Sequence, residues 1–216
     1  MAHIHLQDGA FPLSFTLLWW AVALVLLLAC LLLLRRAERL PSREITVAAL
    51  CTAAAFAFFQ IELPLFGGIH LNLTPLIGIL AGPVIGGIIV FLVNLLSAGL
   101  GHGGWGMIGA NTLVNMAEVA VAALLFTGLR RAGTSPGVRA GIATFAALAV
   151  GNAAMVGIIM VSGIQGVSQE GSSLLAGLSL VVLVNMVVAV VEAMVTALMV
   201  AFIARARPAL LGETGP

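Results

Sequence analysis

Long runs of apolar residues with very few charges between them constrain this chain more than any other feature. The first run extends from about Pro12 to Leu34, and runs of similar length follow it almost to the C-terminus. Roughly 20 apolar residues in a helix cross the hydrocarbon core of a bilayer. Of the 216 residues, 62% are hydrophobic and 8% are charged, against about 25% charged in a typical soluble domain. We therefore expect an all-α integral membrane protein. This composition excludes a soluble globular protein, a disordered chain and a nucleic-acid-binding protein.

The basic residues set the predicted topology. All nine are arginines, and they fall into groups beside the apolar runs: Arg35, Arg36, Arg39 and Arg43, then Arg130, Arg131 and Arg139, then Arg205 and Arg207. Positive residues mark the cytoplasmic side of a membrane protein. Placing every group inside puts the N-terminus outside and the C-terminus inside. The first run has no basic residue before it and exceeds the roughly 7–15 apolar residues of a signal peptide, so we expect it to remain as a membrane helix.

Five spans follow from this placement, at about residues 12–34, 45–61, 107–129, 140–162 and 174–204. The run from Leu73 to Leu100 must then begin and end outside, and Gly82-Pro83 divides it. We predict two short or tilted helices joined at Gly82-Pro83, with a re-entrant hairpin as the alternative. The expected fold is a compact bundle of about seven transmembrane helices. It forms a single domain over residues 1–216, with an external segment (1–11), the bundle (12–205) and a cytoplasmic tail (206–216).

The histidines are all predicted to lie on the outer side, opposite the arginines. They are His3, His5, His70 and His102. If Met1 is removed, the Ala2 amine with the His3 amide and imidazole can chelate a divalent metal in one plane. If Met1 is retained, His3 is the third residue and can close a four-nitrogen plane by itself. Nitrogen-rich planar geometry favours nickel or copper over zinc or magnesium.

Two further histidines lie in predicted external loops. His70, with Asn72 close by, precedes a broken helix, and exposed backbone at such a place is tolerated where it lines a cavity. His102 lies among five glycines, which allow the loop to approach another backbone closely. Both positions are therefore candidates for a metal site on the outer face, with His70 as a ligand and His102 and Asn72 supporting the site or gating it.

Polar residues also occur inside the predicted spans. Asn111, Asn115 and Glu118 share one helix face, as do Asn185, Glu192 and Thr196. Intramembrane carboxylates are costly and indicate a function by default. Glu118, Glu192 and Asn111 could support or gate a metal path, or could hold the bundle together by interhelical hydrogen bonds. Alternatively, Glu118 and Glu192 could serve an ion- or proton-coupled secondary carrier.

Three stretches of the sequence carry a resemblance to a known family. They are His5-Leu6-Gln7-Asp8-Gly9, His70 followed by Ile77-Gly78-Ile79-Leu80-Ala81-Gly82-Pro83, and His102-Gly103-Gly104 followed by Gly109-Ala110-Asn111-Thr112. In this order, and over nearly its whole length, the chain resembles the CbiM/NikM family. These proteins are the cobalt/nickel-specific substrate-binding (S) components of energy-coupling factor transporters.

The resemblance implies a metal-capturing subunit that is not an enzyme and needs no organic cofactor. It implies cobalt(II) or nickel(II) as cargo, with cobalt for cobalamin biosynthesis favoured, and a place in the cytoplasmic membrane of a prokaryote. The implied partners are ATPase subunits, a transmembrane coupling protein and a small accessory membrane protein, which is not fused to this chain.

The resemblance also implies the ligands, which are Ala2 after loss of Met1, His3 and His70. The family usually begins Met-His, whereas this chain begins Met-Ala-His-Ile-His. Position relative to the terminus therefore favours His3, while the register with Asp8-Gly9 favours His5. We expect His3 to be the ligand, because chelation by amine, amide and imidazole needs the histidine beside the terminal residue. His5 remains a candidate for a second ligand or a delivery site.

Overall fold

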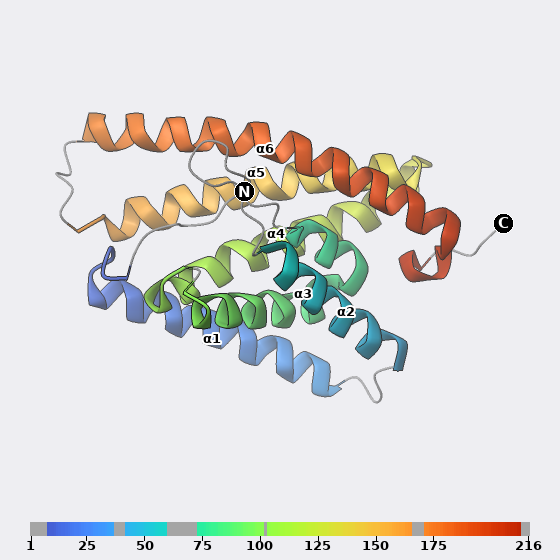
Figure 1. Ribbon diagram of the computed structural model, residues 1–216, viewed down its shortest axis with the longest axis horizontal. Coiled ribbons are helices and arrows are strands. Elements are labelled where there is room, and N and C mark those ends of the chain that lie inside the picture. The colour runs from blue at the N-terminus through green and yellow to red at the C-terminus, as the bar shows by residue number, and fades with distance from the viewer. Residues whose placement is uncertain (1–7, 37–41, 60–72, 102, 166–170, 213–216) are drawn as a thin grey trace.

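The chain folds into a bundle of helices, described by a computed structural model over residues 8–36, 42–59, 73–101, 103–165 and 171–212. These ranges hold the helices α1 (Leu13–Arg36), α2 (Ser42–Phe59), α3 (Thr74–Gly99), α4 (Ile108–Gly128), α5 (Pro136–Ser162) and α6 (Gly171–Ala206), with short 3-10 turns η1 (Trp105–Met107), η2 (Leu129–Ala132) and η3 (Pro208–Leu211) (Figure 1). They contain no strand. Five of these helical stretches are long and apolar enough to cross a membrane, so the all-α membrane class is confirmed.

The spans predicted from the arginines agree closely with the helices. The bounds of α1, α2, α4, α5 and α6 differ from the predicted ones by four residues or fewer. Between α2 and α4 the sequence predicts two short or tilted helices joined at Gly82-Pro83. The structure has two helical arms joined by the non-helical Gly82, and together they form α3. The described residues hold six α-helices, so the predicted count of seven is not confirmed.

The predicted interruption within α3 is present as a sharp bend. Gly82 has φ 72° and ψ 176°, a conformation open to glycine because it lacks a Cβ, and Pro83 cannot donate a backbone hydrogen bond. A Cβ on Gly78 and a Cβ on Gly86 would both collide with Val119 of α4. On a straight helix these two glycines would be about 12 Å apart. The glycine and proline thus fold the helix back on itself without separating it into two elements.

The two arms of α3, residues 74–81 and 83–99, lie alongside each other, since a Cβ on Gly86 would be 3.4 Å from Ile77 Cγ2. Leu76 and Ile79 of the first arm belong to a buried cluster with Phe126, Val200 and Leu211, from the ends of α4, α6 and η3. The second arm ends beside η1, at the start of α4. The first arm is about 12 Å long, too short to cross a hydrocarbon core of about 30 Å. A short arm joined to a longer one at Gly82 agrees with the predicted pair of helices.

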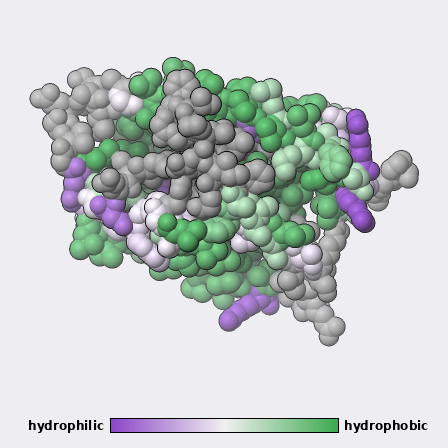
Figure 2. Space-filling view, viewed as in Figure 1, coloured by the Kyte–Doolittle hydropathy of each residue, from purple (hydrophilic) through white to green (hydrophobic). Residues whose placement is uncertain are grey.

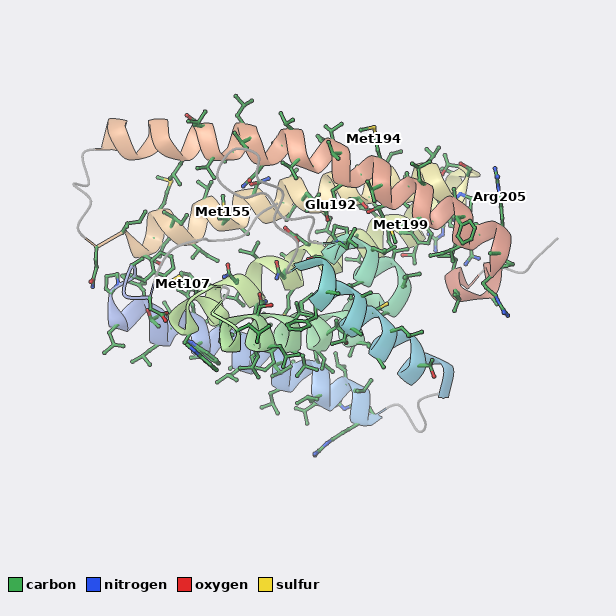
Figure 3. All side chains as sticks on the ribbon, in the orientation of Figure 1. Met107, Met155, Glu192, Met194, Met199 and Arg205 are labelled. Carbon is green, nitrogen blue, oxygen red and sulfur yellow. The ribbon has the colours of Figure 1, made fainter. Side chains whose placement is uncertain are left out.

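The arginines gather at one end of the bundle, which we call the arginine end. Arg35 and Arg36 close α1, and Arg130 lies in η2. Arg205, which is labelled in Figure 3, lies in the last turn of α6. Arg130 Nη2 donates a hydrogen bond of 2.6 Å to the carbonyl of Gly212 and so ties η2 to the chain after η3. Among the residues that are coloured in Figure 2, most are hydrophobic, and the few strongly hydrophilic ones lie mostly at the margins of the view. This distribution is typical of a protein surrounded by lipid.

Glycines let the helices approach one another closely. A Cβ on Gly109 of α4 would lie 2.5 Å from the Trp20 nitrogen and 2.6 Å from the Trp19 carbonyl carbon, both backbone atoms of α1. In lipid, helix association depends on such backbone proximity, because burial of apolar surface gives little gain there. Within α1 the only buried residue is Ala23. The contact at Gly109 is therefore a main attachment of α1 to the bundle.

Candidate functional site

Most of the predicted site residues lie outside the described part of the chain. These are Ala2, His3, His5, His70, Asn72 and His102. The other three, Asn111, Glu118 and Glu192, are buried within the bundle. No group of three or more His, Cys, Asp or Glu side chains in the described ranges could hold a metal. The described residues therefore supply the surroundings of the predicted metal site, not its ligands.

The carboxylate of Asp8 attaches the N-terminal segment to the loop before α4. Asp8 Oδ1 accepts a hydrogen bond of 2.7 Å from the Gly106 amide, and Oδ2 accepts one of 3.1 Å from the Trp105 amide. The first amides of a helical stretch have no carbonyl one turn earlier to pair with. Asp8 supplies those acceptors from 97 and 98 residues away in sequence. In the sequence, Asp8 marks only the register of a motif. The glycines of the loop indicate a close backbone approach, which the structure confirms at Gly104, but they do not indicate that Asp8 is the partner.

The residues after Asp8 are fixed on the other side, against α5. The Ala10 carbonyl accepts a hydrogen bond of 2.8 Å from the Gln165 amide. Phe11, only 2% exposed, belongs to a cluster that includes Met107 before α4 and Met155 of α5, both labelled in Figure 3. Residues 8–11 are thus attached to both α4 and α5, at the end of the bundle opposite the arginine end.

Two tryptophans of α1 complete this end of the bundle. Trp19 Nε1 donates a hydrogen bond of 2.8 Å to Ser162 Oγ, at the end of α5. Trp20 Nε1 donates one of 3.1 Å to the Trp105 carbonyl. The peptide groups around Trp105 are therefore held by Asp8 from the N-terminal segment and by Trp20 from α1.

A network of asparagines lies deeper in the bundle. Asn94 of α3 donates to Thr112 Oγ1 at 3.4 Å and accepts from Asn115 at 3.5 Å. Between α5 and α6, Asn185 donates to the Asn152 side-chain oxygen at 2.9 Å. The predicted common face of Asn111, Asn115 and Glu118 is confirmed, because all three are buried. Sequence reasoning missed Asn94 and Asn152, although a single asparagine within an apolar run is a detectable signal.

The two intramembrane acids, Glu118 and Glu192, are both fully buried. Figure 3 shows Glu192 on the side of α6 that faces the bundle. Neither carboxyl oxygen of Glu118 has a hydrogen-bond partner among the described residues. The Glu118 side chain instead packs against Gly151 of α5. A Cβ on Gly151 would be 2.7 Å from Glu118 Cγ and 2.8 Å from Glu118 Cδ.

We expect Gly151→Ala to lower the thermal stability of the purified protein. The new methyl group would overlap the buried Glu118 side chain, and such overpacking costs about 1–3 kcal/mol. Glu118→Gln should leave stability near that of the native chain, since it keeps the shape of the acid and removes its charge. The measurement is thermal unfolding in detergent. In the double variant, Glu118→Ala should relieve much of the penalty at position 151, and additive losses would show that the two side chains are not in contact.

Comparisons with known proteins extend over almost the whole chain. The family model CbiM, described as the cobalt uptake substrate-specific transmembrane region, matches residues 5–210. A relative in Methanocorpusculum labreanum, "Putative cobalt transport protein CbiM 1", is 27% identical over 220 residues, covering 98% of this chain and 94% of its own. "Putative cobalt transport protein CbiM 2" from the same organism is 26% identical, with the same coverage.

Two solved structures have a similar fold. A crystal structure of a transition metal transporter superposes with a TM-score of 0.79 at 16% identity, covering 94% of this chain and 93% of that one. A truncated transition metal transporter gives a TM-score of 0.71 at 16% identity, with 94% and 97% covered. At this level of identity the likeness concerns the fold alone.

Proposed function

This chain belongs to the CbiM family of cobalt uptake substrate-specific transmembrane regions, and we propose that it captures cobalt(II) at the outer face of a prokaryotic cytoplasmic membrane for ATP-driven uptake. The family is a transporter component and not an enzyme. ATP hydrolysis accordingly belongs to partner subunits, joined to this chain through a transmembrane coupling protein, with a small accessory membrane protein as a further partner. The observation that carries the proposal is the attachment of residues 8–11 across the end of the bundle opposite the arginines.

The proposed orientation follows from the same arrangement. With the arginine end inside, the segment that begins at Asp8 lies outside and η3 lies inside. α1, α4, α5 and α6 are proposed to cross once each. α2, whose apolar stretch Ala48–Ala57 is shorter, is proposed to cross as well, and α3 to enter and return on the outer side. The single domain of residues 1–216 then has its N-terminus outside and its C-terminus inside, as the sequence predicts.

The proposed ligands are Ala2, after loss of Met1, with His3 and His70. His5 is the alternative to His3. Support comes from Asp8, which closes the first family motif and is held firmly at this end. His102 is proposed to support or gate the site, because it lies in the same loop as the amides that bind Asp8. Asn72 and Asn111 are proposed to help in the same way.

Cobalt is the proposed cargo, with nickel as the second choice. The family description and the names of both relatives refer to cobalt, which supports a role in supplying cobalamin biosynthesis. Planar chelation by nitrogen ligands favours nickel instead. No organic cofactor is part of the proposal.

Metal accumulation in whole cells tests the function. Cells without their own cobalt and nickel uptake systems would express this chain with or without ATPase and coupling subunits of an energy-coupling factor transporter. We expect cobalt, measured by elemental mass spectrometry, to accumulate only when the partner subunits are present. Equal accumulation without them would contradict the proposal.

That contrary outcome would favour a second candidate function, an ion- or proton-coupled secondary carrier. The complete burial of both Glu118 and Glu192 favours this candidate, since intramembrane acids often form part of an ion path. In that case Glu118→Gln would abolish accumulation. For an ATP-driven uptake subunit, the same variant should transport cobalt as the native chain does.

A further inference from the structure

We propose that Asp8 is a positioning residue, whose carboxylate holds the N-terminal segment on the 103–106 loop and thereby sets the affinity for the metal. This inference rests on the proposed function, because His3 and the terminal amine belong to the segment that Asp8 holds. Asp8 is not one of the proposed metal ligands, so its role in binding would be indirect.

The loop before α4 is shaped to receive this carboxylate. Both oxygens of Asp8 accept backbone hydrogen bonds, from the Gly106 and Trp105 amides. A Cβ on Gly104 would collide with Asp8 Oδ1 and lie 2.8 Å from its Cγ and 3.1 Å from its nitrogen. Gly104 itself has φ −88° and ψ 147°, which any residue adopts. The absence of a side chain at position 104 therefore provides space for Asp8 rather than backbone freedom.

Asp8 makes the contact nearest the N-terminus among the described residues of this segment. The contacts that follow it are the hydrogen bond from the Gln165 amide to the Ala10 carbonyl and the packing of Phe11 against Met107 and Met155. Without the Asp8 carboxylate, the segment would keep these later attachments and lose its fixed point nearest the terminus. The chain should still fold, and the part that precedes Asp8 should be less restricted.

A less restricted segment should bind metal more weakly. The nitrogen ligands of the N-terminal segment must bind the same metal ion as His70, which comes from another part of the chain. The effective concentration of the segment near His70 therefore contributes to the affinity for the metal. Freedom that is lost only on binding weakens the complex. Groups that orient metal ligands without touching the metal typically change affinity about 10–100-fold. We expect Asp8→Ala to fall within that range.

The experiment is equilibrium binding of cobalt(II) to the purified full chain in detergent, measured by calorimetry. Asp8→Ala should raise Kd by about 10–100-fold, with little change in Tm. Asp8→Asn keeps an oxygen for the Gly106 amide and should have a smaller effect. Glu44→Ala, which removes an acid near the start of α2 at the other end of the bundle, is the matched control and should bind as the native chain does.

Gly104→Ala disturbs the same contact from the loop side and leaves Asp8 in place. It should raise Kd in the same way, and the double variant with Asp8→Ala should be no worse than the more affected single one, because both remove one interaction. If Asp8→Ala does not fold, Gly104→Ala decides the question. Hydrogen exchange at the Trp105 and Gly106 amides should become faster in both variants, which confirms that the contact is broken.

The results separate this inference from the function on which it rests. A native chain that binds neither cobalt nor nickel would overturn the proposed function. A native chain that binds cobalt, with unchanged Kd in Asp8→Ala and Gly104→Ala and faster exchange at both amides, would overturn the role of Asp8 alone. A lower Tm with unchanged Kd would make Asp8 a structural residue and would equally reject the inference.

Discussion

Replacing Gly109 by alanine is expected to detach α1 from the bundle and to cause a large loss of stability. The new Cβ would lie 2.5 Å from the Trp20 nitrogen, and 2.6 Å and 2.8 Å from the carbonyl carbon and oxygen of Trp19. These are backbone atoms of a helix, so no change of rotamer can move them aside. The cost should reach the upper part of the range for overpacking, about 3 kcal/mol.

The loss should extend beyond the contact itself. When α1 moves away, Trp19 would lose its hydrogen bond to Ser162, and Trp20 would lose its bond to the Trp105 carbonyl. Thermal unfolding in detergent measures the effect. The matched control is Gly128→Ala on the same helix, where no atom lies within 4 Å of a new Cβ. Equal melting temperatures for the two variants would show that α1 and α4 do not meet at Gly109.

Replacing His70 or His3 by alanine is expected to produce the largest loss of metal binding. Each is a proposed ligand, and loss of a ligand should exceed the roughly 10–100-fold cost of losing a group that only orients one. Cobalt(II) affinity should therefore fall by more than about 100-fold in either variant. Calorimetry on the purified chain measures it, together with the Tm of each variant, so that misfolding can be recognised.

Two control histidines make this measurement specific. His102→Ala should weaken cobalt binding much less, because His102 is not among the proposed ligands. His5→Ala should do the same if His3 is the N-terminal ligand. Mass analysis of the intact chain will show whether Met1 is removed. Unchanged affinity in His3→Ala with loss in His5→Ala would assign the role to His5 and favour the motif register over the distance from the terminus.

The helices could be predicted from the sequence because the signal is local. Apolar length and the position of the arginines located α1, α2, α4, α5 and α6 within a few residues. The spacing of Asn111, Asn115 and Glu118 placed them on one buried face of α4. Each of these predictions depends only on helical geometry within a single element.

What could not be predicted depends on contacts between distant segments. Gly82 and Pro83 indicated a break in α3, but not the angle, since glycine allows many values of φ and ψ. The two arms of α3 lie together because Gly78 and Gly86 both leave space for Val119 of α4. Neither the sequence of α3 nor that of α4 reveals this contact by itself. Similarly, the hydrogen bonds to Asp8 could not be predicted, because every residue except proline has a backbone amide that can donate one.

The fixed position of Asp8 limits how far the N-terminus can reach. An extended chain spans at most about 3.3–3.6 Å per residue, so His3, five residues earlier, lies within about 18 Å of the Asp8 Cα, and His5 within about 11 Å. Chain length alone sets these limits. Any partner that delivers metal to His3 has to approach within about 18 Å of the Asp8 Cα. Residues inserted between His3 and Asp8 would enlarge the accessible volume and dilute the terminal amine within it.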